Sequence, residues 1–354
     1  MISAETPSKF LIIDGISGVP LGREIEEALQ TEGYLTTYFD CLKQGARCFY
    51  SLRSACAKAL NKRVDKDGFY SLPKLTMTEL ERLFTSEMPT YILVIGFIYK
   101  FFDPQDLKYL ATKFHSQLLL YDTDSCNLYS RRREYIFFIE KELPIYDRIF
   151  SFSQVTTRFF RETCRLPASH LPYGAHPIDL PENQDKSIDV LFVGSGDLRR
   201  ILLLEAIRDK VTIFGDRWQR NFPLISRELQ ARITARPVWG KDLHCLLAQS
   251  KIVLNITRSD FYGAETGVNL RIFEAVAAGC FLLTDHCDEI EELFEIGNEI
   301  DTFHSSGELV EKVRYYLTHE NERIRVAQCG HERFMRSHIW QARTRELVQS
   351  INLT

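Results

Sequence analysis

Long apolar runs are missing from this 354-residue sequence, and none approaches the ~18 residues of a membrane-spanning helix. We therefore expect no membrane span. The first nine residues are polar and lack the apolar core of a signal peptide. An excess of positive charge is missing too, because 44 Lys and Arg stand against 48 Asp and Glu. This balance disfavours a protein held on nucleic acid by electrostatics alone, although a local basic patch remains compatible with it.

Paired cysteines and clustered histidines are also missing. The nine cysteines are odd in number and none stands in a CxxC pair, which is typical of reduced, mostly buried thiols. We therefore expect a cytoplasmic protein. The histidines show no metal-ligand spacing, and neither a Walker loop nor a Ser-His-Asp set stands out. The sequence thus predicts neither a bound metal nor another cofactor.

The order of apolar patterns is what the sequence does contain. Short apolar runs alternate with segments of helical period, which is typical of βαβ units and parallel sheets. A chain of this length suits two domains. The predicted strands are 10–14, 35–39, 91–95, 117–121, 148–152, 189–193, 211–214, 237–239, 251–256 and 280–284. The predicted helices are 23–32, 104–114, 154–163, one that follows Gly196 and ends near 209, and 243–249, 269–278, 306–317, 321–336 and 340–351.

A domain boundary is predicted between residues 171 and 186. This stretch holds Pro172, Gly174, Pro177 and Pro181 and has little periodic pattern, as linkers do. We expect an N-terminal domain over 1–172 and a second domain over 173–338.

The segment DVLFVGSGDLRR (189–200) is the first that carries chemistry. A strand, the turn Gly194-Ser195-Gly196 and a helix start would place free backbone N–H groups where they attract phosphate. Arg199 and Arg200 could add charge-assisted contacts. An ordinary glycine turn with surface arginines is the alternative.

The second segment is GVNLRIFEAVAAGCFLLT (267–284). Arg271 and Glu274 share one helix face, with the cation and the carboxylate near the helix start. Arginine suits a diphosphate, and glutamate can accept from ribose hydroxyls. The alternative is a plain i,i+3 ion pair, worth only about 0.2–0.5 kcal/mol.

These two segments, together with LLAQSKIVLNITR, EELFEIGNEI and CGHERFMRSHIWQARTREL, resemble the C-terminal domain of CgeB-type glycosyltransferases, which are related to glycosyltransferase family 4. The resemblance covers about 189–347, and the first half fits more loosely. It implies an α/β fold of the GT-B type, with two Rossmann-like domains facing across a cleft. It also implies that residues 339–354 form a helix that packs back on the N-terminal domain.

The resemblance implies a glycosyltransferase that is metal-independent and retains the anomeric configuration. Its donor would be a UDP-, GDP- or TDP-linked sugar. Glu274 would bind the ribose, Arg271 and Arg200 the diphosphate, and Trp239 would border the nucleobase. The donor-binding residues predicted in this way are Gly15, Gly194, Ser195, Gly196, Arg200, Trp239, Arg258, Asn269, Arg271 and Glu274. Arg271 is predicted to be catalytic as well.

One position departs from the family pattern. Related enzymes often carry two glutamates separated by seven residues, but Thr266 stands eight places before Glu274, with Glu265 one place off. This puts the role of the first glutamate in doubt. A non-catalytic nucleotide-sugar-binding protein on the same fold is therefore an alternative.

Asp122-Thr123-Asp124 follows a predicted strand. A DxD at a strand end is also the metal-binding signature of the other large glycosyltransferase architecture, GT-A. The donor-like segments come later in this chain, so we expect a polar strand end, with Asp124 orienting an acceptor hydroxyl or acting as base. A metal-dependent enzyme using Asp122 and Asp124 stays open as an alternative.

The acceptor is not readable from the sequence. A protein, a glycan, a small molecule and a modified nucleic acid are all compatible with it. The run Arg131-Arg132-Arg133 is either a solvated face or part of a basic acceptor site.

Overall fold

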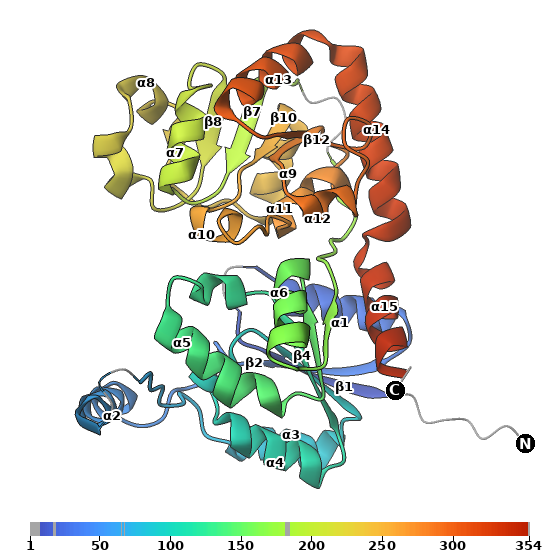
Figure 1. The fold of residues 1–354 in the computed structure, drawn as a ribbon. Coiled ribbons are helices and arrows are strands. Elements are labelled where there is room, and N and C mark those ends of the chain that lie inside the picture. The colour runs from blue at the N-terminus through green and yellow to red at the C-terminus, as the bar shows by residue number, and fades with distance from the viewer. Residues whose placement is uncertain (1–7, 17–18, 65, 67, 181–184, 353–354) are drawn as a thin grey trace, which may run out of the picture. The chain divides into compact units, whose positions relative to one another are not determined.

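The computed structural model describes residues 8–16, 19–64, 66, 68–180 and 185–352. The chain divides into two compact units, Met1–Pro172 with Arg343–Thr354, and Tyr173–Ala342. Each unit contains one six-stranded sheet (Figure 1). Every pairing within both sheets is parallel. Pro181, one of the predicted linker residues, and residues 17–18 of the loop after Gly15 lie outside the described residues.

The sheet of the first unit has the order β2-β1-β3-β4-β5-β6. Its central strands are continuous apolar runs because helices cover both faces, as in most parallel sheets. The strands are β1 (Lys9–Asp14), β2 (Leu35–Asp40), β3 (Tyr91–Ile95), β4 (Gln117–Asp122), β5 (Arg148–Ser151) and β6 (Ala168–His170). The first five follow the predicted strands closely, and the sequence analysis missed the three-residue β6.

Helices connect these strands, because parallel strands need crossover connections. Their starts follow local chemistry: the carboxylate of Asp103 accepts from Gln105 N, with Pro104 at the first helical position. The helices are α1 (Leu21–Thr31), α2 (Tyr50–Val64), α3 (Thr78–Glu87), α4 (Pro104–Lys113), α5 (Arg132–Phe137) and α6 (Gln154–Arg158). The last helix, α15 (Trp340–Asn352), belongs to this unit from Arg343 onward.

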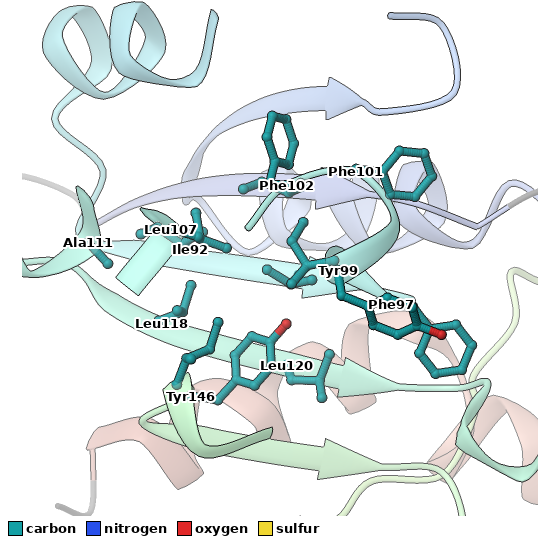
Figure 2. Packing of buried hydrophobic residues seen from close by; sticks show 14 of the residues in the cluster. Ile92, Phe97, Tyr99, Phe101, Phe102, Leu107, Ala111, Leu118, Leu120 and Tyr146 are labelled. Atoms are coloured by element: carbon teal, nitrogen blue, oxygen red, sulfur yellow. The ribbon is translucent and has the colours of Figure 1, made fainter. Parts of the chain in front are cut away.

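The core of the first unit is rich in aromatic side chains from the segment after β3 (Figure 2). Phe97, Tyr99, Phe101 and Phe102 are all buried there. The Phe97 ring meets Phe138 edge to face at 5.1 Å, a favoured aromatic geometry. This packing fixes the short 3-10 helix η1 (Ile98–Lys100) that follows β3.

A carboxyl group completes this core. Glu142 is fully buried; its Oε1 accepts from Ile98 N and its Oε2 from Tyr99 N, at 3.0 and 2.8 Å. The Tyr146 hydroxyl donates to Oε1 at 3.0 Å. These contacts satisfy N–H groups at the start of η1, but burial still raises the pKa of Glu142 to about 7.

The sheet of the second unit has the order β12-β11-β10-β7-β8-β9. Its strands are β7 (Ile188–Val193), β8 (Val211–Phe214), β9 (Ile233–Thr234), β10 (Ser250–Asn255), β11 (Leu282–Asp285) and β12 (Asp301–Phe303). Its helices are α7 (Leu198–Glu205), α8 (Arg227–Gln230), α9 (Gly240–Ala248), α10 (Ser259–Tyr262), α11 (Leu270–Ala277), α12 (Asp288–Glu291), α13 (Ser306–Thr318) and α14 (Glu320–Ser337).

The strand predicted over 237–239 is wrong. The strand lies instead at β9, where Ile233 pairs with Ile213. Pro237 lacks the N–H that a sheet ladder needs, and Trp239 is the N-cap of α9. The apolar residues Pro237, Val238 and Trp239 therefore lead into helix α9 instead of forming a strand.

In each sheet the strand order reverses beside the first strand. Strand β1 lies between β2 and β3, and β7 lies between β8 and β10. The chain therefore turns to one side of the first strand and later returns to its other side. Open parallel sheets bind ligands at the carboxyl ends of the strands next to such a reversal. In the second unit this place is formed by the residues after β7 and β10.

Within the described part of the chain, no helix combines the length and apolar character needed to cross a bilayer.

Gly330 lies where α14 passes close to a loop, and it yields a stability prediction. A Cβ at this position would lie 2.2 Å from the carbonyl oxygen of Glu299. Alanine usually stabilises a helix interior by about 0.5–1 kcal/mol over glycine. Here we expect Gly330→Ala to lower the free energy of unfolding by about 1–3 kcal/mol, because backbone must move. Urea denaturation measures the change.

Gly307, in the first turn of α13, provides the matched control. A Cβ there meets nothing closer than Ser305 Oγ at 3.8 Å. Gly307→Ala should therefore leave stability unchanged or raise it. Equal effects of the two substitutions would contradict the close approach at Gly330.

Glu142 yields a prediction on pH. The folded state holds its proton more tightly than the unfolded chain, since its pKa rises from 4.5 to about 7. The free energy of unfolding should therefore fall as pH rises from about 4.5 to about 7, by on the order of 3 kcal/mol from this group. Urea unfolding at several pH values measures the slope. Glu142→Gln, which cannot titrate, should flatten that slope, and an unchanged slope would contradict the assignment.

Candidate functional site

Side-chain amides organise the carboxyl edge of the second sheet. Asn255 ends β10 and donates from Nδ2 to Thr284 Oγ1 at 2.9 Å. Asn269 donates to Asn255 Oδ1 at 3.0 Å and accepts from Arg271 N at 3.0 Å. Asn269, a predicted donor-binding residue, is thus the N-cap that fixes the start of α11.

A buried carboxylate joins the neighbouring elements. Asp285 ends β11 and accepts from Thr257 N and Thr257 Oγ1 at about 3.0 Å, and from Arg199 Nη1 at 2.6 Å. Arg199 also donates to Thr257 O, and its guanidinium lies 3.6 Å from the Tyr262 ring centroid. Asp285 therefore ties α7, the segment after β10 and the end of β11 together. The sequence analysis missed Asp285, although the polar-strand-end rule that selected Asp122 applies equally to it.

The Gly194–Gly196 loop differs from the expectation that its N–H groups are free. Gly194 N donates to Phe214 O and Gly196 N to Asp216 O, each at 2.9 Å. Trp218 Nε1 donates to Gly194 O. These bonds form because the end of β8 and the residues after it run alongside the loop. They leave neither glycine N–H free for a phosphate.

Arg200 points into the second unit. Its Nε donates to Ile256 O at 2.8 Å and its Nη1 to Ser195 O at 3.0 Å. Burial, followed by the proximity of Arg258, lowers the pKa of Arg200 to about 10. The structure therefore places Arg200 behind Ser195 as a support for the loop, while its neighbour Arg199 lies at the sheet edge.

Arg258 follows β10 and is half-buried. Its guanidinium lies 4.9 Å from the Phe261 ring centroid. Among the described residues it has no ion-pair partner. A cation next to the strand-order reversal is thus available to an anionic ligand.

Arg271 and Glu274 form a close pair at the start of α11. Arg271 Nη1 lies 2.7 Å from Glu274 Oε2, and the two side chains are 11% and 17% exposed. Arg271 Nε is buried and has no hydrogen-bond partner among the described residues. Nη1 approaches the carboxylate without hydrogen-bond alignment. Burial raises the pKa of Glu274, against the influence of Arg271 and His244.

An arginine with unused buried donors is unusual, because buried polar groups in proteins are nearly always paired. Guanidinium groups are well suited to phosphate oxygens, to which they donate in pairs. Arg271 can therefore accommodate an anionic group that satisfies its Nε and Nη1.

Two further positions lie near these segments in the sequence. Trp239 is the N-cap of α9 and its side chain is 47% exposed. Thr266, which replaces the expected first glutamate, is buried and donates from Oγ1 to Glu289 Oε2 at 3.0 Å. Glu265 is exposed, with φ +56°.

In the first unit, Gly15 and Asp124 lie at the carboxyl ends of β1 and β4. Gly15 N donates to Ile95 O at 2.9 Å, and a Cβ at Gly15 would lie 2.7 Å from the Phe101 ring. Asp124 is partly buried and accepts from Asn127 Nδ2 at 2.8 Å. The structure thus places these two predicted residues in a different unit from the other predicted site residues.

Asp122 is enclosed by donors. It is buried and accepts from Ser125 N, Ser125 Oγ and Ser151 Oγ at 2.9, 2.6 and 3.0 Å. Burial raises the pKa of this carboxyl group. In the described ranges, no group of three or more His, Cys, Asp or Glu is arranged to hold a metal ion.

Comparison with known proteins adds a sequence match. Residues 199–349 match the family described as glycosyl transferase-like. The matched range contains α7 from Arg199 onward, α11, and Asp285 with its partners Arg199 and Thr257. The comparison with curated protein sequences finds no match.

Solved structures match nearly the whole chain. Anabaena HepE in complex with UDP and glucose has a TM-score of 0.61 at 14% identity, covering 98% of this chain and 100% of that chain. A sucrose-phosphate synthase from Thermosynechococcus elongatus has a TM-score of 0.60 at 11% identity, covering 98% of each chain. The lipopolysaccharide outer core galactosyltransferase WaaB has a TM-score of 0.58 at 12% identity, covering 97% of this chain and 99% of that chain. These likenesses and the two parallel sheets identify the chain as an α/β protein with the two-domain GT-B fold, as the sequence predicted.

Proposed function

We propose that this protein is a glycosyltransferase that takes a sugar from a UDP-, GDP- or TDP-linked donor. The observation that carries the proposal is the buried Nε of Arg271, which has no partner among the described residues and lies on α11 beside Glu274. This pair lies within the range that is glycosyl transferase-like in sequence. The HepE complex with UDP and glucose, a protein of the same fold, supports a nucleotide-sugar as donor.

Arg271 would contact the diphosphate of the donor. As the sugar–phosphate bond breaks, negative charge grows on the departing diphosphate, and a fixed guanidinium stabilises that charge more than it stabilises the intact donor. Glu274, as a carboxylate, accepts hydrogen bonds only and so suits ribose hydroxyls. Trp239 would border the nucleobase, and Arg258 would add a cation near the sugar and phosphate.

The glycine loop has an indirect role in this proposal. Arg200 and the bonds of Gly194 and Gly196 hold the backbone of the loop in one shape. Ser195 at its centre would present its side chain to the donor. These residues therefore position the site, whereas Arg271 and Arg258 would touch the phosphates.

We further propose that transfer needs no divalent metal and retains the anomeric configuration. The first point is supported by Asp122, whose oxygens already accept from two serines and from backbone. Asp124 is then available to orient the acceptor hydroxyl or to act as base. The retaining outcome follows only from the resemblance to CgeB-type enzymes.

Donor binding tests the proposal. Arg271→Lys keeps the charge but loses the planar fork, and Glu274→Gln removes the negative acceptor. We expect each to weaken binding of the cognate nucleoside diphosphate by about 10–100-fold, the value of a charged hydrogen bond. Isothermal titration calorimetry with UDP, GDP and TDP and their sugars measures this.

Arg208→Ala is the matched control, since it removes an arginine paired with Glu228 at 2.7 Å on the surface of the same unit. It should leave donor affinity unchanged. Unchanged affinity in both α11 variants for every nucleotide would exclude the assigned site. Tight donor binding without transfer or donor hydrolysis would instead favour a non-catalytic nucleotide-sugar-binding protein.

Substitution of Asp122 and of Asp124 distinguishes the metal-free proposal from a DxD metal site. Asp122→Asn should lower the free energy of unfolding by about 1–3 kcal/mol, because the amide nitrogen cannot accept from the serines. Asp124→Asn should keep the stability and reduce turnover. EDTA should change neither donor affinity nor turnover, and a dependence on Mn²⁺ lost in either variant would contradict the proposal.

A further inference from the structure

Helix α2 is almost without contacts to the body of the first unit. Of its 15 residues only Ser54 is buried. It is anchored near its start, where the Tyr50 hydroxyl donates to Leu72 O at 3.1 Å and Arg47 Nε to Leu75 O at 2.8 Å. Figure 1 shows α2 apart from the sheet of its unit. Isolated helices of this length are marginal in water, so a helix of this kind gains stability from a partner surface.

Apolar side chains form a stripe along the exposed side of α2. Leu52, Cys56, Leu60 and Val64 are spaced four residues apart, which places them on one helix face. Leu52, Leu60 and Val64 are 65%, 61% and 88% exposed, and Cys56 is exposed as well. Phe49, just before the helix, is 82% exposed. We call these five residues the α2 stripe.

Positive charge accompanies the stripe. Between Tyr50 and Val64 the only charged residues are Arg53, Lys58, Lys62 and Arg63, giving +4 in a chain whose net charge is -4. By helical geometry Arg53 and Arg63 lie within the arc that the stripe residues span, and Lys58 and Lys62 lie on the opposite side. Long basic side chains at such positions can keep their charges at a polar boundary while their stems cover apolar surface.

The basic surface continues beyond α2. Arg133 Nη1 donates to Lys66 O at 2.9 Å, which places the start of α5 beside the chain that leaves α2. Phe69, Glu134 and the run Arg131–Arg133 line a hollow of about 380 Å³. Three further arginines thus lie at the exposed surface next to the chain that leaves α2, and Arg131 Nη1 also lies 3.4 Å from Glu134 Oε2.

We propose that α2 and the run Arg131–Arg133 dock on the surface of an anionic lipid bilayer, with the α2 stripe inserted below the phosphates. Exposed apolar side chains that can enter the membrane interface and cations that attract anionic lipids both contribute to binding of a helix at a bilayer surface. Lipid phosphates complement the +4 charge of α2. A single-stranded nucleic acid would need aromatic stacking platforms, whereas four of the five stripe residues are not aromatic. This inference does not depend on the proposed function.

Vesicle binding by the full-length protein tests the inference. The protein is sedimented with extruded vesicles of phosphatidylcholine alone, or of phosphatidylcholine and phosphatidylglycerol at a ratio of about 7:3, a composition chosen to give the anionic surface that attracts basic segments. We expect binding to the anionic vesicles, weakening as salt screens the charges, and much weaker binding to the neutral ones. No binding, or equal binding to both, would overturn the inference.

Two double variants locate the contact. Arg53→Gln with Arg63→Gln should lower the vesicle partition coefficient about 25-fold, at roughly five-fold for each basic residue that faces the bilayer. Leu52→Ser with Leu60→Ser should lower it at least about ten-fold, because two apolar side chains no longer insert. Both pairs are exposed, so circular dichroism and thermal melting should match the unmodified protein.

The second unit offers a matched control. Leu202 and Leu224 are 65% and 62% exposed, nearly the same as Leu52 and Leu60. Leu202→Ser with Leu224→Ser should leave vesicle binding unchanged. If this pair reduces binding as much as the α2 pair, the inference fails. It also fails if the α2 variants instead abolish self-association or binding of single-stranded RNA while vesicle binding persists.

Discussion

The carboxyl edge of the second sheet depends on one buried carboxylate. Asp285 receives the guanidinium of Arg199 and both donors of Thr257, so three segments distant in sequence meet at its two oxygens. Removing that acceptor would leave buried donors unpaired, at a cost above that of an ordinary lost contact. The positions of α7 and of the segment leading to Arg258 follow from this junction. The arrangement of this edge therefore depends on Asp285.

Local patterns were sufficient for the fold because they carry their own physics. The apolar runs of β3 and β4 are buried on both faces and leave no other placement, and Asn269 before Leu270 supplies a cap at the start of α11. The sequence therefore predicted the α/β arrangement and the face shared by Arg271 and Glu274. The triplet Pro-Val-Trp led to the incorrect strand at 237–239, because hydrophobicity alone does not distinguish a strand from the residues that lead into a helix.

Non-local pairing explains what sequence reasoning missed at the site. The N–H groups of Gly194 and Gly196 donate to carbonyls at the end of β8 and just after it, a pairing that depends on sheet order. Arg200, expected at the diphosphate, instead lies on the buried face of α7 with Ile201 and Leu204. That helical spacing was readable in advance. The unsatisfied Nε of Arg271 was not, since it depends on which groups are absent around it.

The tryptophans of this protein are unequally placed. Trp218 and Trp340 are 0% and 1% exposed, while Trp239 at the start of α9 is 47% exposed. A water-soluble collisional quencher can therefore reach only one of the three indoles in the native protein. The emission that it removes comes from Trp239, at the position proposed to border the nucleobase. The unlabelled chain thus carries an optical reporter of what covers this residue, with two shielded indoles as an internal reference.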